Sequence, residues 1–184
     1  MKSPKETREG LLNAKTDGLL VRIRSPYHNG HVHGYVIDVG PKFFLLRSVS
    51  DDIRYNGFEC FRIKDVRGLK PAPTASFMIA ALALRYPERP ADPIVDLSSL
   101  ETLLRTASAA FPLITLHRER QRPDACWIGK MTDIHEGQVL MRTVAPDATW
   151  DYEYDCFALK SITRVGFGAD YEAALDLVAG VPVD

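Results

Sequence analysis

The sequence predicts a mainly β protein with two tandem five-stranded small β-barrels, each preceded and followed by a short helix. Two observations support this prediction. The stretch from 31 to 69 recurs from 126 to 167, and both copies divide into short, apolar, strand-like runs separated by turn residues. An internal duplication of this kind indicates two copies of one folding unit.

The two copies align at one spacing. A shift of about 95 residues places Gly34 on Gly129 and Asp38 on Asp133 without a gap. The remaining matches, after a single inserted residue for the last three, are Leu45 with Leu140, Arg47 with Arg142, Val49 with Val144, Cys60 with Cys156, Phe61 with Phe157 and Lys64 with Lys160. Identities in this order predict a common fold for the two halves.

The strands can be predicted from their apolar patterns. The runs 43–46 and 139–141 are apolar at consecutive positions, which predicts strands covered on both faces. From Trp150 to Cys156 aromatic residues alternate with acids, which predicts a strand with its aromatic side packed in the core and its acidic side in water. The alternation reverses after Cys60 and after Cys156, so we expect a sharp bend or an extra residue there in both halves.

Helices are predicted ahead of and behind each set of strands. Ser3-Pro4-Lys5-Glu6 has the pattern of a capped helix start and predicts a helix over 3–15, and Ser98-Ser99-Leu100-Glu101 predicts one over 99–108. The run 77–84 is apolar on every side, which favours a helix buried between larger parts. Apolar residues at helical spacing from Tyr171 to Val178 predict its counterpart.

We predict two domains, 1–88 and 94–184, joined by a linker over 86–93 that contains three prolines. The chain has a net charge of −1, 46% hydrophobic residues and 26% charged residues, a composition typical of a globular protein. No run is long enough to span a membrane, and the first ten residues lack the apolar core of a signal peptide, so we expect a cytoplasmic protein. Cys60 and Cys156 are expected to be reduced, packed thiols.

Several of these residues resemble the motifs of the Sm-like (LSm) branch of the SH3-like barrels. Gly34, Asp38 and Leu45, repeated as 129, 133 and 140, follow the order of the first Sm motif, and Val66-Arg67-Gly68 matches the second. In that family an asparagine before the leucine helps to hold a base, whereas Lys42 and Gly137 stand near that place here. The resemblance therefore implies the fold and not the RNA site. The tandem copies also resemble a bacterial group of small-barrel proteins of unknown function.

Basic residues gather after the first strand of each copy. We interpret them as candidate binding residues, because two basic rims would attract phosphates; the alternative is that they lie in solvated loops. The net charge of −1 argues against nucleic acid, since nucleic-acid modules usually carry a basic excess. The candidates are Arg22, Arg24, His31 and His33 in the first copy and Arg118, Arg120 and Arg122 in the second.

Two further groups of residues would suit a site but also have a structural explanation. His28, His31 and His33 would begin a metal site only with a third ligand, so we predict exposed loop histidines and no metal. The aromatic residues Trp127, Trp150, Tyr152 and Tyr154 would suit a stacking platform or a partner anchor, but core packing explains most of them.

The sequence predicts a binding protein and not an enzyme. No nucleophile elbow, phosphate-binding loop, dinucleotide fingerprint or Cys-x-x-Cys motif is present, and no cofactor is expected. We expect a protein partner, or self-association through edge strands. The alternative is an Sm-like RNA- or nucleic-acid-binding protein that uses the paired basic loops.

Overall fold

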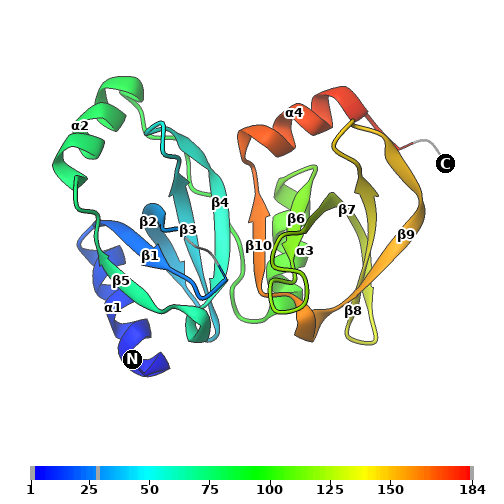
Figure 1. Cartoon of the computed structure of the whole chain (residues 1–184), viewed down its shortest axis with the longest axis horizontal. Coiled ribbons are helices and arrows are strands. Elements are labelled where there is room, and N and C mark those ends of the chain that lie inside the picture. Colours follow the sequence, from blue (N-terminus) through cyan, green and yellow to red (C-terminus); the bar gives the residue numbers. More distant parts are fainter. Residues whose placement is uncertain (1–2, 28–29, 183–184) are drawn as a thin grey trace. The chain divides into compact units, whose positions relative to one another are not determined.

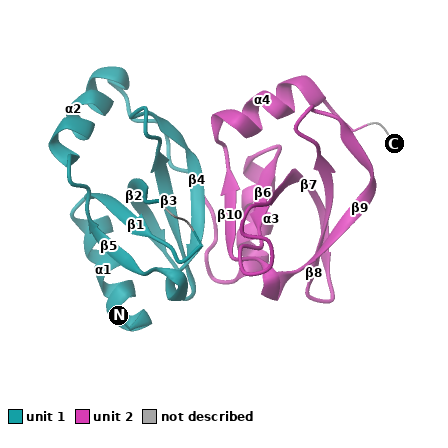
Figure 2. Ribbon diagram, in the orientation of Figure 1, with its two compact units in different colours: residues 1–93 teal, residues 94–184 magenta. Residues whose placement is uncertain are grey.

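The computed structural model describes residues 3–27 and 30–182 and divides the chain into two compact units, 1–93 and 94–184 (Figures 1 and 2). Both units are rich in antiparallel sheet and carry two α-helices each, as the sequence predicts for a mainly β protein. The division follows Pro93, at the end of the predicted linker.

Unit 1 begins and ends with a helix, and its five strands pair in the order β5-β1-β2-β3-β4. A short 3₁₀ turn, η1, separates the last two strands. The elements are α1 (Pro4–Thr16), β1 (Leu20–Arg24), β2 (Val32–Val39), β3 (Phe43–Val49), β4 (Tyr55–Arg62), η1 (Ile63–Asp65), β5 (Gly68–Pro71) and α2 (Ala75–Arg85).

Unit 2 repeats this sequence of elements, and its strands pair in the order β10-β6-β7-β8-β9, the same order as in unit 1. The elements are α3 (Leu100–Ala110), β6 (Ile114–His117), β7 (Cys126–His135), β8 (Gln138–Val144), β9 (Trp150–Ala158), η2 (Leu159–Ser161), β10 (Arg164–Phe167) and α4 (Asp170–Ala179). The predicted duplication is therefore confirmed at the level of topology.

The duplication also holds at the level of single residues. Gly34 and Gly129 lie in matching places, where a Cβ atom would stand 2.2 Å from the carbonyl oxygen of Arg47 and 2.1 Å from that of Arg142. The register of β2 on β3 shifts between Val36 and Asp38, and that of β7 on β8 shifts between Met131 and Asp133. Both glycines are required because the neighbouring strand passes too close for any side chain.

The extra residue expected after Cys60 and after Cys156 is not present at those positions. β3 and β4 pair without interruption through Cys60 and Phe61, and the register shift falls between Arg47 and Val49. Unit 2 shifts at the matching place, between Arg142 and Val144. The reversal of alternation after Cys60 arises because Cys60, Phe61 and Arg62 are all buried, so both faces of this end of β4 are covered.

The first helix of each unit starts at a capping box, as predicted. Ser3 Oγ accepts a hydrogen bond from the Glu6 backbone N–H (3.2 Å), and the Ser3 backbone N–H donates to Glu6 Oε2 (2.7 Å). In α3 the cap is Ser99 and its partner is Thr102, not the predicted glutamate. A threonine hydroxyl at the third helical position makes the same reciprocal pair of bonds.

The core of unit 1 lies between α1 and one face of the sheet. Leu11 and Ala14 of α1 pack with Val21 and Ile23 of β1 and with Phe44 of β3. The other face of the sheet carries α2, which is anchored by Met78 and Leu82 on Leu20 and Val49. The prediction that 77–84 is buried on all sides is wrong, because only Met78 and Leu82 of α2 are buried.

A buried arginine fixes the segment after α2 to unit 1. The Arg47 side chain is 2% exposed; its Nε donates to Asp92 Oδ1 (3.2 Å) and its Nη2 to the Pro90 carbonyl (2.6 Å). Its guanidinium also lies over the rings of Tyr55 (5.2 Å) and Phe58 (5.0 Å). The proline-rich segment is thus held by specific contacts to the first unit.

Candidate functional site

The basic candidates of unit 1 lie on adjacent strands of one sheet. β1 turns Val21 and Ile23 to the core and the intervening Arg22 to the opposite face. Arg22 pairs with His33 of β2 on one side and with Lys70 of β5 on the other. His31, in the segment before β2, and Arg24, at the end of β1, are exposed. The cationic row of Lys70, Arg22 and His33 therefore crosses three strands.

Lys70 belongs to this row but sequence reasoning missed it. The basic residues after the first strand are close together in the sequence, whereas Lys70 is separated from Arg22 by three strands. The only signal that would find it is the antiparallel pairing of β5 with β1, and this pairing places Lys70 directly opposite Arg22.

As far as the structure describes the chain, the positive charges of the cationic row are not neutralised by neighbouring side chains, and the surroundings of His33 disfavour its protonated form. Within the described parts of the chain, the side chains of Arg22, Arg24 and Lys70 make no ion pair or hydrogen bond. The pKa of His33 is lowered from its ordinary value of 6.5, first by burial and then by His31 and Arg22, while Asp51 opposes the shift. At neutral pH His33 is therefore mostly the neutral imidazole.

The arginines of unit 2 do not form an equivalent row. Arg118 is half-buried, with its guanidinium over Trp127 (5.5 Å) and Phe157 (5.6 Å) and its Nη2 donating to Gln121 Oε1 (2.5 Å). Arg120 and Arg122 are exposed in the segment between β6 and β7. Of the three, Arg118 has a packing role, and none lies on a strand.

The sheet positions of unit 2 that match the cationic row are uncharged. Strand pairing places Thr115 between Ile128 and Gly166, as Arg22 stands between His33 and Lys70. Thr115 Oγ1 donates to Glu172 Oε1 of α4 (2.5 Å), and both side chains are buried. The fold therefore does not require cations at these positions.

The nearby ionic groups of unit 2 form an internal network. Arg164 Nε contacts Glu119 Oε1 at 3.1 Å, and the two side chains are 13% and 3% exposed. Arg164 Nη2 also lies 3.2 Å from His117 Nδ1. Because Arg164 and Glu119 neutralise one another, this part of unit 2 does not present a basic rim.

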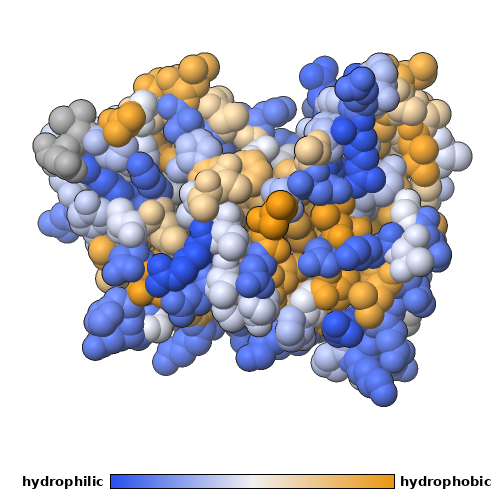
Figure 3. Space-filling model, turned by 180° about the vertical axis from the view of Figure 1, so that it is seen from behind, coloured by the Kyte–Doolittle hydropathy of each residue, from blue (hydrophilic) through white to orange (hydrophobic). Residues whose placement is uncertain are grey.

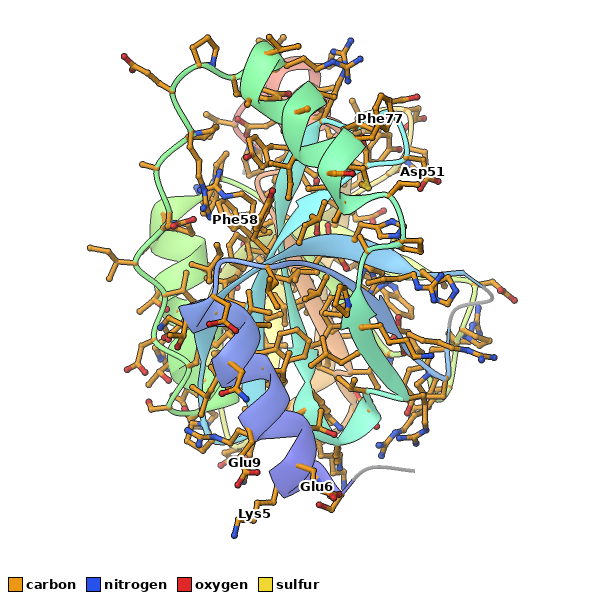
Figure 4. All side chains as sticks on the ribbon, turned by 90° about the vertical axis from the view of Figure 1, so that its left-hand side faces the viewer. Lys5, Glu6, Glu9, Asp51, Phe58 and Phe77 are labelled. Atoms are coloured by element: carbon orange, nitrogen blue, oxygen red, sulfur yellow. The ribbon has the colours of Figure 1, made fainter. Side chains whose placement is uncertain are left out.

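Exposed apolar residues lie on the last helix of both units. In α2 the side chain of Leu84 is 85% exposed, and Phe77 and Ile79 are exposed with it. In α4 Leu177 is 86% exposed, together with Tyr171 and Val178. Figure 3 shows apolar surface over each of these helices, and Figure 4 shows Phe77 projecting from α2. We call these surfaces the α2 face and the α4 face.

Both helices are held in place at their C-terminal ends. Arg85 Nη1 donates to the carbonyls of Asp52 and Ile53 (2.7 Å for Ile53), in the loop between β3 and β4. In unit 2 Trp150 Nε1 donates to the carbonyl of Ala179 (3.2 Å), in a cluster with Leu175. The α2 and α4 faces therefore lie on helices whose C-terminal ends are hydrogen-bonded to the rest of their own unit.

The aromatic residues of β9 are placed differently from the prediction. Trp150 is half-buried, but Tyr152 is 94% exposed and Tyr154 is also exposed. The acids Asp151 and Asp155 instead contact the sheet, with Thr143 Oγ1 2.6 Å and 2.9 Å from their Oδ2 atoms. Alternation separates two sets of side chains but does not say which set packs inward.

Within the described residues, the cysteines and histidines form neither a disulfide nor a metal-binding cluster. All three cysteines are free; Cys60 is buried, and burial followed by Glu59 raises its pKa, whereas Cys156 is exposed, contrary to the prediction. No group of three His, Cys, Asp or Glu side chains that would hold a metal ion occurs within 3–27 and 30–182. His28 lies outside these ranges.

In comparisons with known proteins, no protein-family model, no curated protein and no solved structure matches this chain. Across the described residues, no helix has the length and apolar character to cross a membrane.

Proposed function

We propose that this chain is a non-enzymatic, cytoplasmic protein-binding module that docks partners on the α2 and α4 faces. The observation that carries the proposal is the exposure of large apolar side chains on the last helix of both units. Grouped exposed apolar residues, unlike scattered ones, are typical of protein interaction sites. Leu84 and Leu177 are the most exposed residues of the two faces and are therefore the positions to test.

The composition of α2 supports this role. No charged residue occurs between Ala75 and Leu84, and Met78 and Leu82 suffice to anchor the helix. On the outer side, Phe77 and Leu84 are separated by two turns with small alanines between them, whereas Ile79 lies on a different side of the helix, next to the buried Leu82. An apolar helix face of this kind fits an apolar groove or helix on a partner protein.

The finer fold assignment is also a proposal. We propose that each unit is an Sm-like small barrel, a reading supported by the leading helix, the strand order β5-β1-β2-β3-β4 and the paired register shifts that curve the sheet. Self-association through strands at the end of each unit's order, such as β5 in unit 1 and β9 in unit 2, is part of the same proposal. The acids of β9 discourage uncontrolled strand addition.

The nucleic-acid alternative rests on two equivalent basic loops. The packed Arg118 and the neutralised Arg164 do not support this arrangement. A salt titration separates the two functions, because phosphate-backbone binding weakens steeply as salt rises and an apolar protein contact does not.

The test is recovery of partner proteins from native lysate by the tagged chain and by two variants, Leu84→Glu and Leu177→Glu. A buried charge in an apolar contact opposes binding, so we expect each variant to lose the partners of its own face, by about tenfold or more. Ile94→Glu is the matched control, because Ile94 is 94% exposed and lies outside both helices. Nuclease treatment should leave recovery unchanged.

Two results would contradict the proposal. One is that Ile94→Glu and the two helix variants recover the same amount of partner protein, either because all three still bind or because all three have lost binding. The other is loss of all partners on nuclease treatment, which would assign the binding to nucleic acid. Circular dichroism of each variant checks that the units remain folded, as expected for substitutions at exposed positions.

A further inference from the structure

The geometry points to an anion site on the sheet of unit 1, in which Lys70, Arg22 and His33 on three adjacent strands bind a compact phosphate-type dianion, such as free phosphate or a phosphomonoester. This site goes beyond protein docking by the α2 and α4 faces, and it involves neither face. It is formed by β5, β1 and β2 and has no counterpart in unit 2.

The first argument is the placement of like charges. Lys70 and Arg22 are direct cross-strand partners and form the like-charge pair of the row. His33, the partner of Arg22 on its other side, is mostly neutral at neutral pH and adds positive charge only when it takes up a proton. Like charges directly opposite one another in a sheet are destabilising, and no carboxylate within the described residues pairs with Lys70 or Arg22. A bound anion removes this repulsion. Unfavourable local arrangements of this kind are expected at functional sites.

The second argument comes from the duplication. At the same three positions unit 2 has Gly166, Thr115 and Ile128, so the fold is built without any of the cations. Glu172 reaches Thr115 from α4 in unit 2, whereas α2 of unit 1 has no acid at all. The charged row is therefore a property of unit 1 and not of the shared architecture.

The extent of the row favours a small ligand. Three neighbouring strands span about 10 Å, and the fourth residue of the row, Val49 on β3, is buried and apolar. Leu20, the preceding residue on this face of β1, packs under α2. On the same face of β1, the exposed Arg24 extends the basic surface by one residue to the end of the strand. The chain as a whole carries a net charge of −1. A polynucleotide backbone would find only one short segment to contact.

The three side chains suit a phosphate group. The planar guanidinium of Arg22 matches two phosphate oxygens, and the Lys70 ammonium adds a mobile point charge. His33 donates a further hydrogen bond when it takes up a proton. Three charged groups act on His33: Arg22 and His31 oppose its protonation, and Asp51 favours it. Lys70 is more distant, because β1 lies between its strand, β5, and the strand of His33, β2.

The experiment is a titration of the full chain with inorganic phosphate at low salt, followed by amide chemical shifts and by calorimetry. We expect saturable shifts at residues 22, 33 and 70. Arg22→Thr, which copies the residue of unit 2, should raise the dissociation constant about tenfold, and Lys70→Gln should raise it severalfold. Arg122→Gln is the control, because it removes one exposed arginine from unit 2 and should change nothing.

A second titration uses sulfate, whose charge does not change between pH 5 and pH 8. Binding should tighten as the pH falls, and this dependence should disappear in His33→Gln. Shifts spread over both units, or equal weakening by Arg22→Thr and Arg122→Gln, would reduce the effect to general charge attraction and overturn the site. Tighter binding of a single-stranded oligonucleotide without terminal phosphates would overturn the assignment to a compact anion. Neither result bears on partner recovery through the helix faces, so the two proposals fail separately.

Discussion

At the scale of single residues, Gly34 and Gly129 show most directly that the two units are copies. In each case the side-chain position is filled by a backbone oxygen of the neighbouring strand, about 2 Å from where a Cβ would lie. Backbone atoms of a paired strand cannot move aside as a flexible side chain can. The identity of these glycines in the alignment therefore reflects a shared steric requirement.

We predict that Gly34→Ala and Gly129→Ala each destabilise their unit by about 3 kcal/mol, at the upper end of the cost of overpacking. Gly30→Ala is the control, since a Cβ there meets no atom within 4 Å, and it should be neutral. Urea unfolding followed by circular dichroism measures the differences. Similar stability of Gly34→Ala and Gly30→Ala would show that the strands do not approach as described.

His33 provides a pH prediction. Because the folded state lowers the pKa of His33 below the unfolded value of 6.5, the unfolded chain binds more protons, and stability is lost as the pH falls through about 6.5. The loss between pH 7 and pH 5 should be smaller in His33→Gln. In Arg22→Thr the His33 pKa should rise, because one opposing charge is removed. An NMR titration of the imidazole measures it, and an unchanged or lower pKa would contradict the described neighbourhood.

At the scale of elements, the sequence predicted where helices and strands lie but not always which side of them is covered. The capped start of α1 and the consecutive apolar run of β3 each contain their own physical cause, so these elements were predicted correctly. The exposure of α2 was not predicted. The sequence of a helix that is apolar on all sides does not show whether its outer side is buried within the fold or exposed at the surface. The pairing of β5 with β1, which places Lys70 opposite Arg22, could not be predicted from the sequence either.

The basic candidates show the same limit. Arg22 has an apolar residue on either side of it and Arg118 stands in the polar run after Leu116, so the sequence separates a strand position from a loop position. It does not show that, in the described residues, the Arg118 guanidinium is packed against aromatic rings and that of Arg22 is not. The difference depends on the aromatic pair that encloses the Arg118 guanidinium, which is a property of the folded unit.

At the scale of the whole molecule, two copies of one fold have diverged at corresponding surfaces. Unit 1 has a cationic row where unit 2 has a buried Thr115–Glu172 hydrogen bond, yet both units keep an apolar face on the last helix. The presence of that face in both units supports the proposal that partner docking is their shared function. The anion site would then be an addition confined to unit 1.

The most direct test of the proposed docking function is photo-crosslinking in native lysate, with p-benzoylphenylalanine placed at position 84, 177 or 94. The account predicts discrete protein adducts from positions 84 and 177, insensitive to nuclease and to high salt, and none from the equally exposed position 94. Adducts of the same intensity from position 94, or no adducts from either helix, would contradict it.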